Sequence, residues 1–353
     1  MARVNDKMKT SSLLWLLIHM VFAYAALAQA QPARTAQPGT AQLQLCLAGA
    51  VDYSPVYPTQ LFPVGTTHEV AAVVRLSKGE SYRTMFATWT AVDVGAAAPQ
   101  NPVINKVQMQ MQGKDRAAVR MRSGAGALPP GKYRLDITAD GKPWRSAEFS
   151  VVPVHAPDVK QPKDLLPLAP GTIWRYAFEQ QFAPGFKPDL SGGMKLDSDG
   201  RLRATLTRTA ARTDTAGTHI ETRRNNALVE EEWWRLTDKG LVVTQVKNGD
   251  EVEKFDPPSP IWPWPLKTPQ EWSYEPPDKS FKQRWRMWGP LPIKGPAGEA
   301  PGFVVLMEHP SQPIALSVER HYLTGIGMVR ESIIQARNGV LVTRWDNVLT
   351  AKP

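Results

Sequence analysis

Two stretches of this chain, PLAPGTIWRY (167–176) and PLKTPQEWSY (265–274), share the phrase P-L-x-x-[GP]-x-x-W-x-Y. A second shared phrase follows each of them, LTDKGLV (236–242) in the first case and LTGIGMV (323–329) in the second. Self-similarity of this kind marks one structural unit that is used twice. The repeat therefore predicts a duplicated domain, and many of these residues serve to build the fold.

The repeated unit has the pattern of β-structure. Its W-x-Y phrase places two aromatic side chains on one face of a strand, because successive side chains alternate between faces. Gly240 and Gly327 lie between apolar runs, where a turn requires a backbone conformation that other residues resist. We predict a mainly β fold whose C-terminal domain (165–350) contains two related β-meanders, at about 165–255 and 263–350.

The repeat also predicts core positions and loops. We expect Trp174 and Trp272 to occupy equivalent buried sites, because large aromatics at matched positions usually fill the core. From tryptophan to the following Glu232 or Glu319 the copies span 58 and 47 residues, so the first copy carries an 11-residue insertion, expected to be a loop. The joint PPSPIWPWP (257–265) is too rich in proline for a helix or a central strand, which predicts an extended polyproline-like segment.

The N-terminal half shows a different β pattern. In LPPGKYRLDI (128–137) apolar and polar residues alternate, and Asp140-Gly141 is typical of a hairpin turn. This stretch resembles the end of an immunoglobulin-like or fibronectin-like sandwich, which implies an Ig-like β-sandwich over residues 43–153 and indicates no particular function. Residues 154–164 are predicted to be a stiff proline-rich linker.

The first thirty residues resemble a secretory signal. Three basic residues precede an apolar run (13–27), and overlapping A-x-A cleavage sites occupy residues 26–30. The run is shorter than the roughly 20 residues of a spanning helix. We therefore predict a cleaved signal peptide (1–30), a disordered tail (31–42), a mature chain without a transmembrane span, and a periplasmic or secreted location.

Cysteine content and charge narrow the class further. The single cysteine, Cys46, excludes an internal disulfide framework, and Leu45 stands where a lipid anchor requires a small residue. The formal charge of +9 becomes +7 without residues 1–30, since 42 − 3 = 39 basic and 33 − 1 = 32 acidic residues remain. This balance is typical of solubility charge, and an exported basic protein meets anionic envelope components sooner than nucleic acid.

Most catalytic patterns are missing from the sequence. It contains no H-x-H or C-x-x-C ligand pair, no G-x-S-x-G elbow and no dinucleotide fingerprint. The acidic run Glu230 to Glu232 would allow a carboxylate pair around a glycosidic bond, but such runs are usually a solvated sheet edge. Glu308 and His309 are adjacent and so face opposite sides of a strand. We predict no catalytic residue, no metal site and no cofactor.

Residues 165–350 as a whole resemble a class of exported bacterial β-domains that open with P-L-x-x-G-x-x-W-x-Y and close with G-x-G-x-V. Some of these domains resemble the half-barrels of lipoprotein-carrier proteins. The resemblance implies an envelope location and a β-rich fold, and it carries over no functional residue.

Two features are candidates for recognition. Trp262 and Trp264 lie on the proline-rich joint, where exposed rings would stack on sugars or apolar partners and buried rings would close the open end of a barrel. The segment FKQRWRM (281–287) carries a row of basic side chains that would meet an anionic ligand or protect a sheet edge. The candidate ligand-binding residues are Trp262, Trp264, Trp288, Lys282, Arg284 and Arg286.

From these observations we expect a non-enzymatic exported envelope protein that acts as a binding or assembly module. Its partner would be an envelope glycan, an anionic lipid or an envelope protein. Two alternatives stay open: an envelope glycan hydrolase or lyase with acidic residues in the C-terminal domain, and a structural subunit of a secretion or surface assembly.

Overall fold

The computed structural model describes residues 42–64, 69–97, 101–111, 115–123, 126–153, 159–186, 188, 190, 195–277, 281–309 and 314–353. The predicted signal peptide (1–30) lies outside these residues, as does all but the last residue of the tail predicted over 31–42. Gln42 already begins the first strand.

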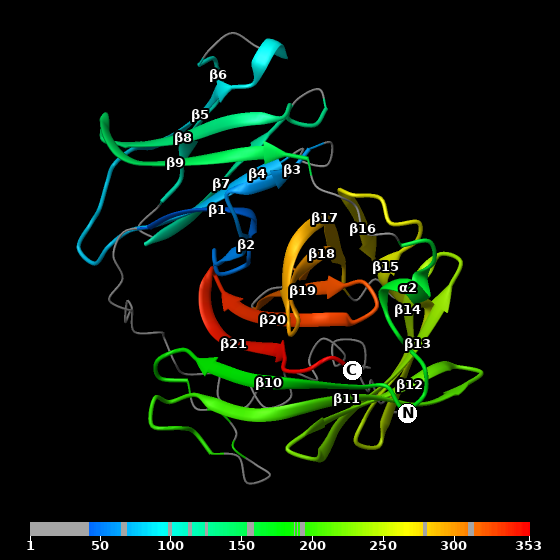
Figure 1. Ribbon diagram of the computed structural model, residues 1–353. Helices are drawn as coiled ribbons and strands as arrows, with labels where there is room; N and C mark the ends of the chain where they lie inside the picture. Colours follow the sequence, from blue (N-terminus) through cyan, green and yellow to red (C-terminus); the bar gives the residue numbers. More distant parts are fainter. Residues whose placement is uncertain are drawn as a thin grey trace, which may run out of the picture.

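The prediction of a mainly β chain is confirmed (Figure 1). The strands described in the N-terminal part are β1 (Gln42–Gly49), β2 (Pro55–Pro58), β3 (Leu61–Pro63), β4 (Glu69–Arg75), β5 (Met85–Asp93), β6 (Val103–Met109), β7 (Arg116–Arg122), β8 (Gly131–Ala139) and β9 (Lys142–Val152), with a 3-10 turn, η3 (Gly95–Ala97). They form two sheets, with orders β2-β1-β4-β7 and β3-β9-β8-β5-β6.

Aromatic residues pack between these two sheets. The rings of Trp89 and Tyr133 lie 6.0 and 5.1 Å from that of Phe149, and the Tyr133 hydroxyl donates a hydrogen bond to the carbonyl of Pro129 at 2.7 Å. Asp140 and Gly141 form the expected tight turn between β8 and β9, both with positive φ. This arrangement supports the Ig-like assignment, which we keep as a proposal.

The C-terminal part forms one large sheet. After the short helix α2 (Pro162–Leu165), its strands are β10 (Ile173–Phe182), β11 (Leu202–Asp214), β12 (Gly217–Arg224), β13 (Ala227–Thr237), β14 (Gly240–Asn248), β15 (Glu251–Pro263), β16 (Gln270–Tyr274), β17 (Gln283–Gly295), β18 (Gly298–His309), β19 (Ala315–Leu323), β20 (Gly327–Arg337) and β21 (Val340–Leu349). Their order is β15-β14-β13-β12-β11-β10-β21-β20-β19-β18-β17-β16, and neighbours are antiparallel.

The duplication is visible strand by strand. Strands β10 to β15 form a first meander and β16 to β21 a second one, and pairing of β10 with β21 joins them. In both meanders the W-x-Y phrase is on the first strand, and the L-T-x-x-G phrase turns from the fourth strand to the fifth. Gly240 and Gly327 occupy these turns with φ of 121° and 88°, as the sequence predicts.

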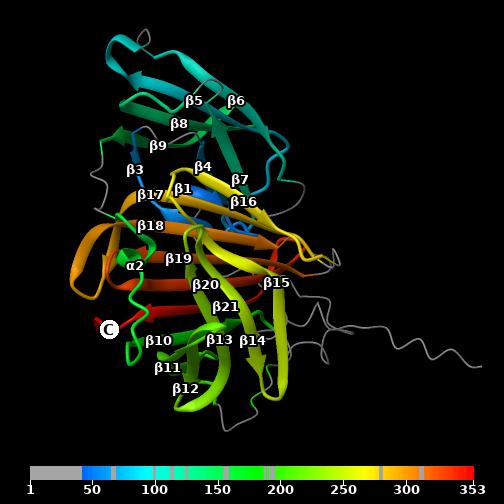
Figure 2. The ribbon, with the colours of Figure 1, turned by 90° about the vertical axis from the view of Figure 1, so that its right-hand side faces the viewer.

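The two edges of this sheet approach each other. The edges are β15 and β16, and Tyr274 on β16 donates a hydrogen bond to the carbonyl of Pro257 on β15 at 3.3 Å. The proline-rich joint is thus largely a strand, where a polyproline-like segment was expected. An edge strand tolerates proline because it needs partners on one side only. The sheet therefore curls into a nearly closed form with an inner and an outer face (Figures 1 and 2).

The two repeat tryptophans differ more than the sequence predicts. Trp174 is 2% exposed, and its indole N–H donates a hydrogen bond to the carbonyl of Ile326 at 2.8 Å. Trp272 is only part-buried, and it stacks on Trp285 with ring centroids 5.8 Å apart. The reason is position: β10 lies in the middle of the sheet, whereas β16 is an edge.

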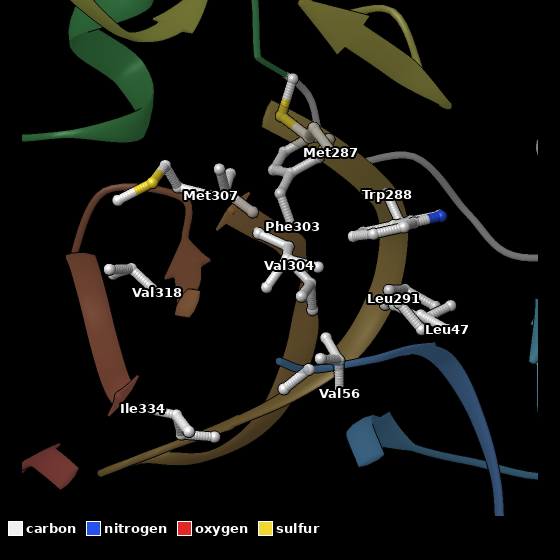
Figure 3. Close-up of a cluster of buried hydrophobic side chains, with 14 of the residues drawn as sticks. Leu47, Val56, Met287, Trp288, Leu291, Phe303, Val304, Met307, Val318 and Ile334 are labelled. Carbon is white, nitrogen blue, oxygen red and sulfur yellow. The ribbon is translucent and has the colours of Figure 1, made fainter. Parts of the chain in front are cut away.

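The N-terminal part packs on the outer face of the second meander. Tyr57 donates from its hydroxyl to the carbonyl of Pro292 at 2.5 Å and from its backbone N–H to Glu319 at 3.0 Å. Figure 3 shows Leu47 of β1 beside Leu291 of β17. One continuous hydrophobic cluster includes residues of both parts, so the proline-rich linker does not separate two independent cores.

The C-terminal end of the predicted linker (154–164) also differs from the extended spacer that the sequence predicts. Residues 162–165 form the helical turn α2, and the Asp164 carboxylate accepts hydrogen bonds from the backbone N–H groups of Lys160 and Gln161 at 3.0 Å. Leu165 and Leu166 are buried. This end of the linker is therefore part of the C-terminal fold and not a spacer. Residues 154–158 lie outside the described residues.

Candidate functional site

The three tryptophans predicted as ligand-binding residues are buried or part-buried. Trp262 is 1% exposed and Trp288 is 9% exposed. Trp264 is part-buried, packs against the hydrophobic core and donates its backbone N–H to the carbonyl of Lys239. Burial of the Trp262 ring agrees with the alternative in which this residue closes the sheet.

The predicted basic row, which lies on β17 and just before it, contains both exposed and buried side chains. Lys282 and Arg284 are exposed, and Lys282 lies 3.8 Å from Glu275. Arg286 is 8% exposed and is paired with Glu308 at 2.9 Å and with Glu69 of the N-terminal part at 3.5 Å. The six candidate residues therefore do not share one exposed surface, and Arg286 helps hold the two parts of the chain together.

A different set of polar residues meets on the inner face of the sheet. Glu331 on β20 is fully buried and pairs with Arg320 on β19 at 2.8 Å and with Arg208 on β11 at 3.3 Å. Asn347 on β21 donates its side-chain amide to Glu331 at 2.8 Å. Strands β11 and β20 are separated by β10 and β21, so the contact between Arg208 and Glu331 requires the strong curvature of the sheet.

The cluster continues across the first meander. Arg208, Thr222 and Glu230 lie directly opposite one another on β11, β12 and β13, and Glu232 follows on the same face. Arg208 lies over the ring of Tyr176 at 6.0 Å, an arrangement that favours the cation. The inner polar cluster consists of Arg208, Thr222, Glu230, Glu232, Arg320, Glu331 and Asn347.

Burial changes the ionisation of the acidic residues in this cluster. Loss of water contact, followed by repulsion from Glu230, raises the pKa of Glu232 to about 7. Burial likewise raises the pKa of Glu230. For Arg208 burial works against the charged form, but the nearby Glu331 outweighs it and the pKa ends above its ordinary value. The inner face therefore holds stable cations beside Glu232, which carries its proton up to nearly neutral pH, and beside Glu230, whose pKa is also raised.

Several polar atoms of the cluster have no hydrogen-bond partner in the described part of the chain. These atoms are Nε of Arg208, Oγ1 of Thr222 and Oδ1 of Asn347. The three residues are 6%, 2% and 2% exposed. An unpaired buried polar group costs on the order of 1–3 kcal/mol, so each of these atoms works against the stability of the fold.

The other residues considered from the sequence for metal binding or catalysis are Cys46, Glu308 and His309. No group of three or more His, Cys, Asp or Glu residues there is arranged to hold a metal ion. Burial raises the pKa of the Cys46 thiol to about 12, which leaves it protonated and unreactive. Glu308 pairs with Arg286 at 2.9 Å, whereas the His309 ring lies 5.6 Å from that of Phe281, so the two side chains have different neighbours. No helix in the described ranges is long and apolar enough to cross a membrane.

For the acidic run Glu230 to Glu232, the sequence pattern predicted a solvated sheet edge. Glu232 is 8% exposed and Glu230 is part-buried, so a solvated edge is wrong for these two residues. Glu231, on the opposite face, does form the expected polar contacts, with His219 and Lys247 at 2.8 Å each. The available signal was the strand alternation, since Glu230 and Glu232 share a face with the buried Trp234.

Comparisons with known proteins give the following result. No protein family and no curated protein matches this chain. A structure from Bacteroides fragilis, provisionally described as an exported protein with a YmcC-like fold, is 11% identical, with a TM-score of 0.27, and covers 54% of this chain and 98% of its own. A provisionally described lipoprotein from Parabacteroides distasonis is 14% identical, with a TM-score of 0.23, and covers 53% and 97%. Likeness at this level does not bear on function.

Proposed function

We propose that this chain is an exported, non-enzymatic binding protein of the bacterial cell envelope, in which the inner face of the C-terminal sheet holds the ligand. The observation that carries the proposal is the inner polar cluster, with three unpaired polar atoms, enclosed by the curled sheet. Buried polar groups that converge among aromatic side chains are typical of ligand sites. Export is proposed on the basic and apolar N-terminal segment.

The two parts of the chain have different roles in this proposal. The N-terminal part, proposed as an Ig-like module over residues 43–153, covers the outer face of the second meander through Tyr57 and through Glu69, which pairs with Arg286. That contact supports the second meander and leaves the inner face of the duplicated domain for the ligand. The exposed Lys282 and Arg284 would then add an outer contact to an anionic envelope component.

One observation favours a second candidate function, an envelope glycan hydrolase. Glu230 and Glu232 are two residues apart on one face of β13, which separates them by about 7 Å along the strand. Inverting glycosidases use two carboxyl groups about 6.5–9.5 Å apart, and the acid among them requires a raised pKa. The pKa of Glu232, about 7, satisfies that requirement.

The test has two steps. The full chain is expressed in a bacterium, cell fractions are separated, and the N-terminus of the exported form is sequenced; cleavage within residues 26–31 and absence from the cytoplasm are expected. The exported protein is then mixed with washed bacterial envelopes and sedimented. We expect it to be retained without releasing reducing sugar. A cytoplasmic chain, or one that never co-sediments, contradicts the proposal, and sugar release that Glu232→Gln abolishes favours the hydrolase.

A further inference from the structure

Two connections of the N-terminal part meet at one of its ends. One is the loop 76–84 between β4 and β5, and the other is the tight turn between β8 and β9, which projects from the N-terminal part in Figure 1. The Asp140 carboxylate in this turn accepts a hydrogen bond from the backbone N–H of Arg83 at 3.0 Å, and the ring of Tyr82 lies 6.3 Å from that of Trp144. These contacts join residues 76–84 and 140–145 into one surface, called the tip surface below.

The tip surface carries four exposed basic side chains, those of Lys78, Arg83, Lys142 and Arg145. No ion pair joins any of them to another residue of the described ranges. The Arg145 guanidinium instead donates a hydrogen bond to the carbonyl of Trp144 at 2.8 Å and lies over the Trp144 ring at 5.0 Å. These charges therefore face solvent, where an anionic partner is able to reach them.

The two acidic residues of the tip surface are occupied by its own loops. Asp140 accepts the backbone hydrogen bond described above, and Glu80 accepts one from the backbone N–H of Ser77 at 2.7 Å, which holds the pKa of Glu80 below its ordinary value. Four basic and two acidic residues give the tip surface a formal charge of 4 − 2 = +2. The nearby Asp115 pairs with its neighbour Arg116 at 3.5 Å. The tip surface is therefore complementary to an anion.

The arrangement of these groups favours a lipid surface over an acidic glycan. Lys78 lies at the apex of a turn closed by the hydrogen bond between the Glu80 N–H and the Ser77 carbonyl, and Lys142 directly follows the turn between β8 and β9. Charges on protruding turns suit a broad surface, whereas a single sugar unit is usually bound in a concave site. Arg145 covers one face of the Trp144 ring, which leaves little of it for stacking on a sugar. Part-buried tryptophan and tyrosine beside basic side chains are typical of residues at the boundary between a membrane and water.

Resting on the proposed export but not on the ligand of the inner face, we infer that the tip surface docks this protein on an anionic lipid surface of the envelope. Lys78, Arg83, Lys142 and Arg145 attract the headgroups, and each strengthens binding by a factor of about five. The Trp144 side chain lies at the level of the headgroups. Salt weakens the attraction, since exposed charges are screened beyond about 8–10 Å near physiological ionic strength.

The double variant Arg83→Gln with Lys142→Gln tests the docking. Both side chains are exposed and form no ion pair in the described part of the chain, so the melting temperature should stay unchanged. The matched control is Lys132→Gln with Lys239→Gln, which removes the same charge from two exposed sites outside the tip surface. The comparison therefore separates the position of the charges from the net charge of the protein.

The exported protein is sedimented with vesicles of phosphatidylethanolamine and phosphatidylglycerol, with neutral vesicles of phosphatidylcholine, and with polygalacturonate as an acidic glycan. We expect binding to the phosphatidylglycerol vesicles, weaker binding at high salt, and little binding to the neutral ones. The tip double variant should bind about thirtyfold more weakly, because two factors of about five are lost. The control double variant should bind nearly as well as the unchanged protein.

Four results would overturn the inference. Equal losses from the two double variants would show that net charge, and not the tip surface, is responsible. Equal binding to neutral vesicles would exclude the role of the basic side chains. Binding to polygalacturonate without binding to vesicles would assign the surface to an acidic glycan, and absence of all binding would remove the docking. The proposed function survives each result if washed envelopes still retain the protein, and it fails if they do not, whatever the vesicles show.

Discussion

The two meanders have the same strand order but different surroundings. In the second meander both faces are covered, and five consecutive residues of β18, Phe303 to Met307, are buried. In the first meander Trp174, Tyr176 and Phe178 are buried while the residues between them are exposed. A duplicated unit thus keeps its topology while the sequence of each strand adapts to what covers its outer face.

The two meanders also differ in what contacts them. The N-terminal part contacts the second meander from outside, through Tyr57 and through the ion pair of Glu69 with Arg286. The first meander contributes Arg208, Thr222, Glu230 and Glu232 to the inner face, and the second contributes Arg320, Glu331 and Asn347. Both copies therefore supply the inner polar cluster, whereas the second copy also supports the contact with the N-terminal part.

The largest expected effect distinguishes the two repeat tryptophans. Trp174→Ala should lower the free energy of unfolding by about 3–5 kcal/mol, as for other buried tryptophan truncations. Trp272→Ala should cost only about 1–2 kcal/mol, because Trp272 lies part-buried on an edge strand. Denaturant unfolding of the full chain measures both. Trp174→Phe is the intermediate variant, since it removes the hydrogen bond to Ile326 and only part of the buried ring, and equal losses for the two alanine variants would contradict the asymmetry.

Glu232, on the inner face of the first meander, should make the free energy of unfolding depend on pH. Because the folded-state pKa of Glu232, about 7, exceeds its ordinary value of 4.5, the folded protein holds a proton that the unfolded chain releases between these values. Stability contributed by the protonated group is complete below pH 4.5 and is lost as the pH rises to about 7. At about 1.4 kcal/mol per unit, the loss is on the order of 3 kcal/mol.

Glu232→Gln should remove this slope, because glutamine does not ionise. The variant should be more stable than the unchanged protein above pH 7 and similar below pH 4.5, as measured by urea unfolding at several pH values. Glu231→Gln is the control on the opposite face, where Lys247 and His219 lower the pKa of Glu231. A slope between pH 4.5 and 7 that Glu232→Gln leaves intact would show that another group is responsible.

The contact between the N-terminal part and the second meander should couple their unfolding. Tyr53 and Tyr57 both have positive φ, a strained conformation for tyrosine, and Tyr57 contacts Pro292, Glu319 and His321. Tyr57→Ala should cost about 2 kcal/mol and divide a single calorimetric transition into two.

Tyr82→Ala is the matched control for that experiment, because Tyr82 contacts Trp144 within the N-terminal part. It should lower the melting temperature and leave a single transition. Two separate transitions in the unchanged protein would mean that the hydrophobic contacts between the parts are too weak to couple them.

Sequence patterns predicted the topology better than the site. Repeated phrases and turn glycines depend on local backbone geometry, so the two meanders and the turns at Gly240 and Gly327 could be predicted. The burial of Arg286 and Trp262, and the meeting of Arg208 with Glu331, depend on which distant strands the curvature and docking bring together. A single sequence contains no local signal for such contacts, so it could not distinguish the buried candidates Trp262, Arg286 and Trp288 from the exposed Lys282 and Arg284.

The smallest expected effect comes from a comparison of two arginines on opposite faces of β11, Arg203 and Arg208. Arg203 on β11 points outward and forms hydrogen bonds with Glu179, Asp197 and Asp199, all part-exposed or exposed. Exposed ion pairs contribute little, since water and salt screen them. Arg203→Ala should therefore leave the melting temperature unchanged at physiological salt, whereas Arg208→Ala on the inner face should lower it clearly by leaving Glu331 with one arginine fewer in a buried environment. Thermal unfolding of the two variants side by side measures the contrast. A comparable loss from both would mean that the inner face is as accessible to water as the outer one, and the argument for a buried polar site would then fail.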